Sequence, residues 1–361
     1  MRDEVNEPPA TEQSGGTEAR RFVPIGKPGN PRWLVPAGQR VSGADFAGWG
    51  PYRLSSRLAW SASKAALRWG FASRASKRHE FQFQQAASLD WQALGWQRSH
   101  EPYIFIYLGT PGTNRKAVLH LIDPISAACE LIVKLPLTEP AQVAIAHEAQ
   151  TLRELEREAF IAAPRLVCFD PASNVCSQTV VRGMRCGRQF TREIATVLQS
   201  LMHPQEIINL SDAASWLQQQ TNLLEMSAED VLLVAAALDA ISHDRELPGV
   251  RIHGDFAPWN IKLQADGSAA LVDWEDSRPR GLPLHDAYHF VHQTRYLFGK
   301  QPRPGFRELR FRYSCPLDFG TRRQLEIAYL LDALRQQLAE GDRAHAAFLR
   351  ATLRLTLSEY A

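Results

Sequence analysis

The sequence has 361 residues, of which 45% are hydrophobic, and a formal net charge of +2 at pH 7. Its length and composition fit a globular chain of one large or two moderate domains, and the small net charge gives no indication of a nucleic-acid partner. Five cysteines without metal-ligand or redox spacing indicate free thiols in a reducing compartment, and the lack of a long apolar run or an apolar leader predicts a cytoplasmic protein.

The first hundred residues are expected to precede the main fold. Residues 1–20 are rich in Pro, Gly, Glu, Ser and Thr, which predicts a disordered tail. Residues 21–100 are interpreted as an N-terminal extension. Within it, residues 22–50 contain many Pro, Gly and Trp residues without a clear period, which indicates an irregular segment.

A basic amphipathic helix is predicted over residues 52–78. Helical spacing places five apolar residues on one face: Leu54, Leu58, Ala62, Ala65 and Trp69. Seven basic residues and no acidic residue lie between Phe46 and His79. Such a helix can pack on the domain as an ordinary solvated helix, or it can lie on an anionic membrane surface at the inner membrane face.

Residues 101–182 predict three strands, a helix and two further strands. The strands are expected at Tyr103–Tyr107, Ala117–Ile122, Glu130–Leu135, Arg165–Phe169 and Val175–Val181, and the helix at Val143–Glu156.

Residues 183–361 predict a mainly helical region with one strand-like segment, Gly249–Glu275. Capping boxes indicate one helix that begins at Ser227, with Asp230 as its partner, and another that begins at Thr321, with Gln324 as its partner, and runs toward Leu338. A last helix is expected over about 342–357.

The strand-like segment carries the residues that suggest chemistry. His253, Gly254 and Asp255 follow an apolar strand, and Asn260 lies five residues after Asp255. Two short strands, Asn260–Gln264 and Ser268–Val272, are joined by an Asp-Gly turn and lead to Asp273. Each polar residue taken alone is an ordinary turn or strand-end residue, but four of them at this spacing favour a site.

This spacing indicates phosphoryl transfer from ATP. The reaction needs one carboxylate that orients and accepts the proton of the attacking hydroxyl, and oxygen ligands that hold Mg²⁺ on the phosphates. Asp255 is therefore predicted to be the catalytic base, and Asn260 and Asp273 the Mg²⁺ ligands. His253 is expected to brace the loop through hydrogen bonds.

The motifs HGDFAPWN and VDWE closely resemble those of the aminoglycoside phosphotransferase and choline kinase family, and Asp286 of GLPLHD resembles a structural aspartate of that family. The resemblance covers about residues 100–300. It implies an α+β, protein-kinase-like fold with two lobes, here 101–182 and 183–361. It also implies an ATP-dependent phosphotransferase that acts on a hydroxyl of a small molecule.

The family fold implies a lysine on the third strand that reaches the α- and β-phosphates, and a glutamate on the next helix that holds it. Lys134 is the only lysine in the predicted third strand, and Glu148 lies in the following helix, with Glu154 as the alternative.

Other nucleotide contacts are less sharply indicated. Gly109 and Gly112 lie between the first two strands, where they could cover the phosphates or be plain turn glycines. The backbone near Val180, Val181 and Arg182 is expected to contact adenine. Asp318-Phe319-Gly320 spells the kinase magnesium triplet but lacks a preceding strand, which indicates the end of a loop.

Two alternative functions differ in class. A non-catalytic kinase-fold scaffold is disfavoured because Lys134, Asp255, Asn260 and Asp273 are all present. A protein kinase is disfavoured because Gly254 stands where an arginine that senses activation-loop phosphate is needed.

The acceptor is weakly indicated. Nine acidic and two basic residues in 190–250 suit an amine, whereas twelve basic and eight acidic residues in 282–361 do not suit a polycation. The extension faintly resembles phosphotransferase-like proteins of surface-polysaccharide synthesis, which implies a sugar or a lipid-linked glycan ahead of an aminoglycoside or choline.

Overall fold

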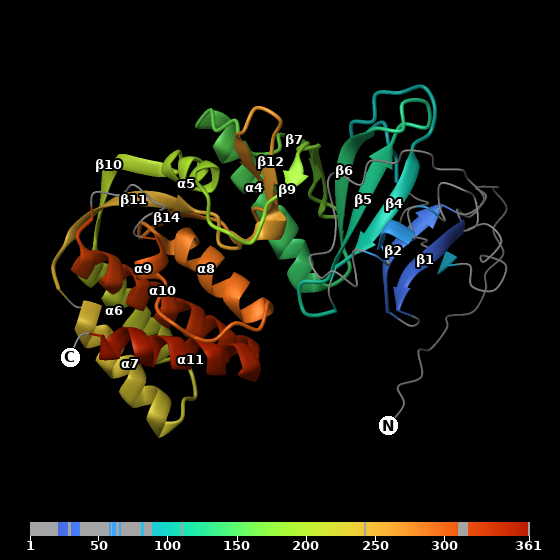
Figure 1. Cartoon of the computed structure of the whole chain (residues 1–361). Helices are drawn as coiled ribbons and strands as arrows, with labels where there is room; N and C mark the ends of the chain where they lie inside the picture. Colours follow the sequence, from blue (N-terminus) through green and yellow to red (C-terminus); the bar gives the residue numbers. More distant parts are fainter. Residues whose placement is uncertain are drawn as a thin grey trace, which may run out of the picture.

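A computed structural model describes residues 21–27, 30–36, 58, 60–62, 65, 81–82, 89–109, 111–241, 243–309 and 317–359. They form two lobes, an antiparallel sheet with one long helix and a mainly helical part (Figure 1). The predicted tail at 1–20 and most of the predicted helix at 52–78 lie outside these residues. In the part of the chain that is described, no helix has the length and apolarity needed to cross a bilayer.

The N-terminal lobe is built on one eight-stranded sheet in the order β3-β1-β2-β4-β5-β6-β8-β7. Its strands are β1 (Arg21–Lys27), β2 (Asn30–Pro36), β3 (Phe81–Gln82), β4 (Tyr103–Leu108), β5 (Lys116–Ile122), β6 (Cys129–Pro136), β7 (Leu166–Asp170) and β8 (Val175–Thr179). The predicted order from β4 to β8, with one helix after the third strand, is confirmed.

Helix α4 (Glu139–Arg157) packs on β6, β7 and β8 and lies between the two lobes (Figure 1). It begins four residues before the predicted start, because Thr138 caps it by accepting a hydrogen bond from the N–H of Ala141. Its buried face includes Ile145 and Leu152 together with one acidic residue, Glu148.

The expectation of an irregular segment over 22–50 is wrong for β1 and β2. These strands pair with each other, and β2 pairs with β4, so both extend the sheet. Trp33 and Leu34 are almost fully buried on opposite faces of β2, in two separate apolar clusters. A strand that is buried on both faces does not alternate between apolar and polar residues, so the sequence lacks the period of two that would have indicated β2.

Aromatic side chains of the extension cover the sheet face that carries Lys134. Register links Trp33 to Tyr107, Tyr107 to Val118 and Val118 to Lys134, and directly paired residues share a face. The Trp60 ring packs 5.7 Å from the Trp33 ring. Trp60 is helical and buried.

The described part of the predicted 52–78 helix packs through Trp60. Leu58, Ala62 and Ala65 of the predicted apolar face are exposed. The membrane contact of this helix stays a prediction, since most of its residues lie outside the described ones.

The C-terminal lobe packs its helices around α10. The helices are α5 (Arg192–Gln199), α6 (Leu210–Thr221), α7 (Ala228–Ile241), α8 (His285–Leu297), α9 (Phe306–Leu309), α10 (Phe319–Glu340) and α11 (Arg343–Ser358). Helix α10 contacts α6, α7, α8, α9 and α11 and buries twelve of its residues (Figure 1).

Two small sheets lie at the catalytic end of this lobe. Their strands are β9 (Met184–Arg185), β10 (Met202–Asn209), β11 (Glu246–Ile252), β12 (Ile261–Leu263), β13 (Ala269–Leu271) and β14 (Arg278–Gly281). Strand β10 was not predicted, and it is defined by its pairing with β11.

The capping predictions have mixed outcomes. Ser227 and Asp230 form the expected pair at the start of α7. Helix α10, however, begins at Phe319, because Asp318 rather than Thr321 is its cap and accepts from the N–H of Thr321. The Asp-Phe-Gly triplet is therefore a helix start.

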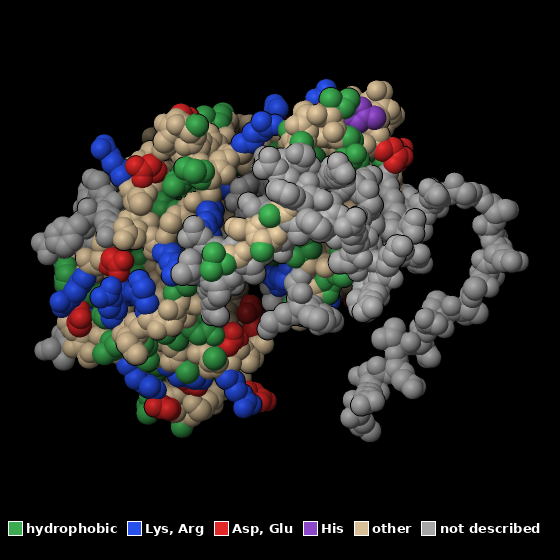
Figure 2. Space-filling view, turned by 45° about the vertical axis from the view of Figure 1, so that its right-hand side comes forward, with side chains coloured by type: hydrophobic (Ala, Val, Ile, Leu, Met, Phe, Trp, Pro, Cys, Tyr) green, Lys and Arg blue, Asp and Glu red, His purple; other side chains and the backbone are tan. Residues whose placement is uncertain are grey.

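The surface charge agrees with the small net charge. On the face in Figure 2, the described basic and acidic side chains are interspersed and form no continuous patch of one sign. The four described cysteines form no disulfide with one another.

Candidate active site

The catalytic loop begins where β11 ends. Gly254 has φ +90°, and a Cβ at this position would lie 2.2 Å from the carbonyl oxygen of Asp276, so only glycine fits. Asp286, at the start of α8, accepts hydrogen bonds from the N–H groups of His253 (2.7 Å) and Gly254 (3.1 Å). These contacts fix the direction in which Asp255 leaves the loop.

The carboxylate of Asp255 is held by two side chains. Asn260 donates from Nδ2 to Oδ2 of Asp255 (2.8 Å) and to its carbonyl oxygen (3.0 Å). Nε2 of His289 lies 3.3 Å from Oδ1. Burial raises the pKa of Asp255, but the hydrogen bond and charge of His289 outweigh it, so the pKa lies below its ordinary value.

His253 is completely buried beside the loop that carries Asp255. Its Nε2 is 3.1 Å from the carbonyl oxygen of Val272, and its ring packs 4.6 Å from the Trp274 ring. It thus links the loop to the chain that leads into Asp273.

The β12–β13 hairpin sets the position of Asp273. The register pairs Ile261 with Leu271, and the N–H of Val272 donates to the carbonyl oxygen of Asn260 (2.9 Å). Asp273 then adopts φ +71°, a left-handed conformation that is rare for a residue other than glycine. Such strain persists only where surrounding contacts enforce it, which is typical of functional sites.

Lys134 joins the two lobes. Its ammonium lies 2.6 Å from Oε2 of Glu148 on α4 and 2.6 Å from Oδ1 of Asp273. Glu154, the alternative partner, is instead bound by Arg251 at 3.2 Å. Burial alone would lower the pKa of Lys134, but the charges of Asp273 and Glu148 raise it above its ordinary value, so the ammonium stays charged.

A second lysine, which the sequence analysis did not single out, reaches the same carboxylate. Lys116 Nζ lies 2.7 Å from Oδ1 of Asp273 and 2.5 Å from Oε2 of Glu275. Burial would raise the pKa of Asp273, but Lys116 and Lys134 outweigh it and hold that pKa well below its usual range. Burial and the charge of Asp273 raise the pKa of Glu275 to about 7.

The two candidate glycines lie in the turn between β4 and β5. The N–H of Gly109 donates to the carbonyl oxygen of Lys116 (2.9 Å) and closes the hairpin. A Cβ on Gly112 would meet nothing within 4 Å. The geometry therefore explains Gly109 as a turn residue, and the phosphate contact of either glycine stays a prediction.

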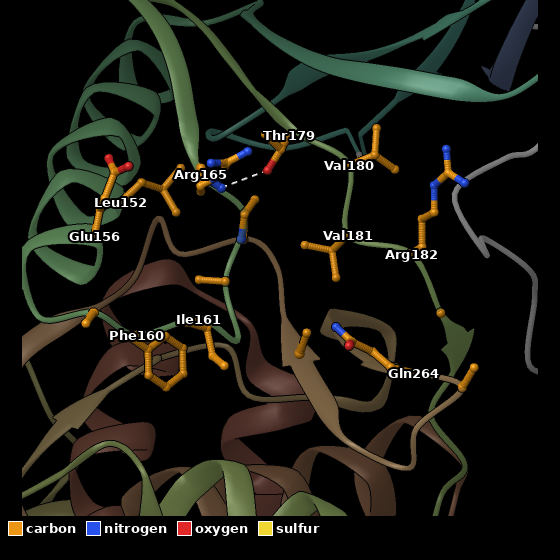
Figure 3. A pocket seen from close by; sticks show the side chains of 16 residues that line it. Leu152, Glu156, Phe160, Ile161, Arg165, Thr179, Val180, Val181, Arg182 and Gln264 are labelled. Carbon is orange, nitrogen blue, oxygen red and sulfur yellow. Dashed lines mark hydrogen bonds between the residues drawn. The ribbon is translucent and has the colours of Figure 1, made fainter.

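Val181 lies in the connection between the lobes and lines a cavity of about 650 Å³ (Figure 3). The cavity is bounded by the end of α4, by Phe160 and Ile161, and by Gln264 after β12. Its lining contains none of the residues that meet at Asp273. The predicted contact of the nearby backbone with adenine stays a prediction.

The donors near Asp273 fit a magnesium ion. Both Asn260 bonds use Nδ2 and leave its carbonyl Oδ1 to a ligand, while Asp273 supplies a carboxylate. Among the described residues, no group of three or more His, Cys, Asp or Glu side chains could hold a metal. Mg²⁺ needs no such group, because it keeps waters and binds substrate phosphates through one or two protein oxygens.

A cavity of about 500 Å³ lies beside Asp255, on the side of α8 and α10. Its lining combines carboxylates, basic groups and aromatic rings, including Trp216, Arg278, Tyr329 and Asp332. An adjoining cavity of about 580 Å³ shares these four residues and adds an apolar wall from β10, α6 and α10.

Most of the residues predicted from the sequence meet at this site, and two residues that meet there were not predicted. Asp255, Asn260, Asp273, Lys134 and Glu148 converge within one chain of contacts. The two missed residues, Lys116 and His289, reach their partners across 157 and 34 positions of sequence. Lys116 directly precedes the predicted strand, which was expected to begin at Ala117, whereas β5 begins at Lys116 itself.

Comparisons with known proteins agree with this geometry. The sequence model of the phosphotransferase enzyme family matches residues 118–327. A search of the curated proteins found no match.

Several solved structures have a similar fold. A choline kinase, LicA from Streptococcus pneumoniae, is 14% identical with a TM-score of 0.50, over 70% of this chain and 92% of its own. A thermostable mutant of an aminoglycoside phosphotransferase, APH(4)-Ia, is 15% identical with a TM-score of 0.49, over 71% of this chain and 94% of its own. Macrolide 2'-phosphotransferase type I is 13% identical with a TM-score of 0.47, over 69% and 90%.

At these identities the likeness shows the fold alone, and the predicted two-lobed, kinase-like fold is confirmed. The family match extends over more than half of the chain and includes Lys134, Glu148 and the whole catalytic loop. This protein therefore belongs to the phosphotransferase enzyme family and is an ATP-dependent phosphotransferase of small molecules.

Proposed function

We propose that the protein transfers the γ-phosphoryl group of ATP to a hydroxyl of a sugar or a lipid-linked glycan. The observation that carries this proposal is the position of Asp255. Its carboxylate lies on the wall of the 500 Å³ cavity and accepts a hydrogen bond from Asn260, whose backbone carbonyl oxygen in turn accepts from the N–H of Val272, the residue before Asp273. A hydroxyl in that cavity can therefore meet a phosphate bound between the lobes.

The residues have distinct proposed roles. Asp255 is ionised at neutral pH because its pKa is lowered, so it accepts a hydrogen bond from the acceptor hydroxyl and orients it. Phosphoryl transfer has a loose transition state and depends mainly on positioning and electrostatics, so a weakly basic carboxylate suffices. Asn260 and Asp273 hold Mg²⁺, and Lys134, fixed by Glu148, binds the α- and β-phosphates.

Mg²⁺, when bound, neutralises charge that develops on the phosphates. The role of His253 is to hold the Val272 carbonyl and so to keep the two halves of the site in register. Gly109 and Gly112 cover the phosphates, and the backbone at Val181 contacts adenine.

The aromatic rings and the paired Asp332 of the cavity support a hydroxyl-rich acceptor. Asp332 is paired with Arg278 (3.0 Å) and with Arg335 (2.9 Å), so its charge is already neutralised by the protein. The lining also holds Asp276, Glu340 and Asp342, so aminoglycosides are kept in the acceptor panel below. Sugars present both donors and acceptors and stack on aromatic rings such as those of Trp216 and Tyr329.

The adjoining apolar cavity supports a lipid-linked acceptor. Leu217, Leu325 and Ala328 contribute to its wall, and it opens beside the same Trp216 that lines the catalytic cavity. One molecule with a glycan head and an apolar tail would fill both spaces. The predicted basic helix at 52–78 would hold the protein near a membrane that carries such an acceptor.

The experiment measures ATP-dependent phosphate transfer to a panel of acceptors in the presence of Mg²⁺. The panel contains free sugars, lipid-linked glycans, aminoglycosides and choline, and each acceptor is tested with the wild type and with Asp255→Asn. We expect transfer to glycans by the wild type alone. Transfer only to aminoglycosides or choline overturns the acceptor class, and ATP turnover equal in both proteins indicates a scaffold.

A further inference from the structure

Lys116 brings a second ammonium into the phosphate site. Only 9% of this residue is exposed, yet its Nζ lies between two carboxylates of the other lobe, Asp273 and Glu275, at 2.7 and 2.5 Å. Lysine is almost never this buried unless its charge is compensated. Lys116 precedes the residues that the family model matches, so nothing in that match accounts for it.

The sheet itself directs Lys116 toward the site. Strand β5 pairs with β6 so that Val118 faces Lys134, and residues two apart on a strand share a face. Lys116 therefore points to the same side as Lys134. The bond from the N–H of Gly109 to the carbonyl oxygen of Lys116 places this lysine at the base of the 109–115 turn.

Two ammonium groups contact the same carboxylate oxygen. Lys116 and Lys134 both contact Oδ1 of Asp273, although Lys134 already has Glu148 as a partner. Two ammoniums on one oxygen repel each other and would also be repelled by a metal ion bound to that oxygen. Once the site is loaded, Lys116 keeps Glu275 but gives up Asp273, and the phosphate chain is the anion that nucleotide binding adds in its place.

We propose that Lys116 is a second phosphate-binding lysine, which exchanges its contact with Asp273 for the terminal phosphates of the nucleotide. Glu275 stays within reach of the ammonium and keeps it at the mouth of the site. Lys134 then binds the α- and β-phosphates, and Lys116 binds the terminal phosphates. This inference rests on the proposed function, since it assumes that a nucleotide binds between the lobes.

A plain structural role makes a different prediction. If Lys116 only joins the lobes, its removal loosens the cleft for every ligand that binds there. The loss of affinity would then be equal for adenosine, AMP, ADP and ATP. A phosphate-binding lysine instead produces a loss that grows with the number of phosphates.

The test compares nucleotide affinity by isothermal titration calorimetry for the wild type, Lys116→Met, Lys116→Arg and Lys300→Met, with and without Mg²⁺. Lys300 is an exposed lysine in the turn after α8 and serves as the matched control. For Lys116→Met we expect unchanged adenosine affinity and a loss of about tenfold or more for ATP. Lys116→Arg should recover part of the loss, and Lys300→Met should bind as the wild type does.

Three results overturn the inference. ATP affinity of Lys116→Met that equals the wild type removes the phosphate contact. Tighter binding of Mg²⁺-ATP shows that the ammonium only occupies the metal position. An equal loss of affinity for adenosine and for ATP shows that Lys116 only joins the two lobes. A wild-type protein that binds no nucleotide instead overturns the proposed function itself, so the two failures are distinguishable.

Discussion

The two lobes contribute to the site in opposite ways. The N-terminal lobe supplies cations on strands, where Lys116 and Lys134 are placed by the register between β5 and β6. The C-terminal lobe supplies carboxylates and an amide on loops, all within the nineteen positions from Asp255 to Asp273. Local spacing therefore sets one half of the site and long-range strand pairing sets the other. Lys134 has Glu148 within its own lobe, whereas Lys116 is paired with two carboxylates of the other lobe, so the site is complete only once the lobes are assembled.

The largest effect is expected on the loop side, from Asp255→Asn. Removal of the group that orients the hydroxyl should lower kcat by about 10²- to 10⁴-fold, while the affinity for ATP stays unchanged because Asp255 faces the acceptor. Steady-state kinetics with nucleotide calorimetry measures both. Asp266→Asn, in the exposed turn between β12 and β13, is the control. Weaker ATP binding by Asp255→Asn would show that Asp255 also contributes to nucleotide binding, so that the two halves of the site do not act independently.

A smaller loss is expected on the strand side, from Glu148→Gln. The amide no longer anchors the Lys134 ammonium, and misplacement of that group by about 1 Å can lower kcat/KM for ATP about 100-fold. Glu154→Gln on the same helix is the matched control, since Glu154 binds Arg251 instead. If Glu154→Gln is the more damaged variant, the assignment of Glu148 is wrong.

Backbone geometry distinguishes two glycines of the C-terminal lobe. Gly254→Ala and Gly267→Ala both place a Cβ on a residue with positive φ, at a cost of about 1–2 kcal/mol. Only Gly254 adds a clash, with the carbonyl of Asp276 at 2.2 Å, whereas nothing lies within 4 Å at Gly267. Urea unfolding should therefore show the larger loss for Gly254→Ala, with reduced kcat. Equal losses would mean that the loop moves freely.

The smallest effect concerns stability at acid pH. Here the lobes are alike, because each contains a buried histidine with a lowered pKa. Burial lowers the pKa of His120, beside Trp33, and of His345, stacked on Tyr296, from 6.5 to about 4. The unfolded chain then takes up protons that the folded chain excludes, so this stability is complete above about pH 6.5 and is lost as pH falls toward 4.

His345→Phe should remove its share of this pH dependence, at most about 1.4 kcal/mol for each pH unit. Urea titrations of the variant and the wild type between pH 4.5 and 7.5 measure the difference. Parallel stability curves for the two proteins would show that His345 titrates normally in the fold.

The sequence predicted the parts of the molecule that depend on neighbours along the chain. The strand order from β4 to β8, the helix that carries Glu148 and the hairpin before Asp273 follow from local periodicity and turn residues. Lys134 and Glu148 did not follow from local patterns but from the resemblance to the family, which implies a lysine on the third strand and a glutamate on the next helix.

Features that depend on distant partners were missed. Strand β2 is buried on both faces and has no alternating pattern, and β10 is a strand only because β11 pairs with it. The capping box of Thr321 and Gln324 predicts the wrong start for α10, because the N–H of Thr321 is bound by the Asp318 side chain, which caps the helix three residues earlier. His289 lies on a helix face like any other polar residue, and only the approach of α8 to the catalytic loop brings it to Asp255.

Helix α4 has a consequence for the way the enzyme opens. Near its middle, Glu148 and His147 bind the chain around Trp274 and Glu275, and near its end Arg251 of β11 binds Glu154 and Glu158. Because α4 is bound to the C-terminal lobe at two points, it cannot move away from that lobe together with the sheet while these contacts persist. Product release therefore requires one of two motions. Either these hydrogen bonds and ion pairs of α4 break, or the sheet moves relative to α4. The second motion would separate Lys134 on the sheet from Glu148 on α4 in each turnover.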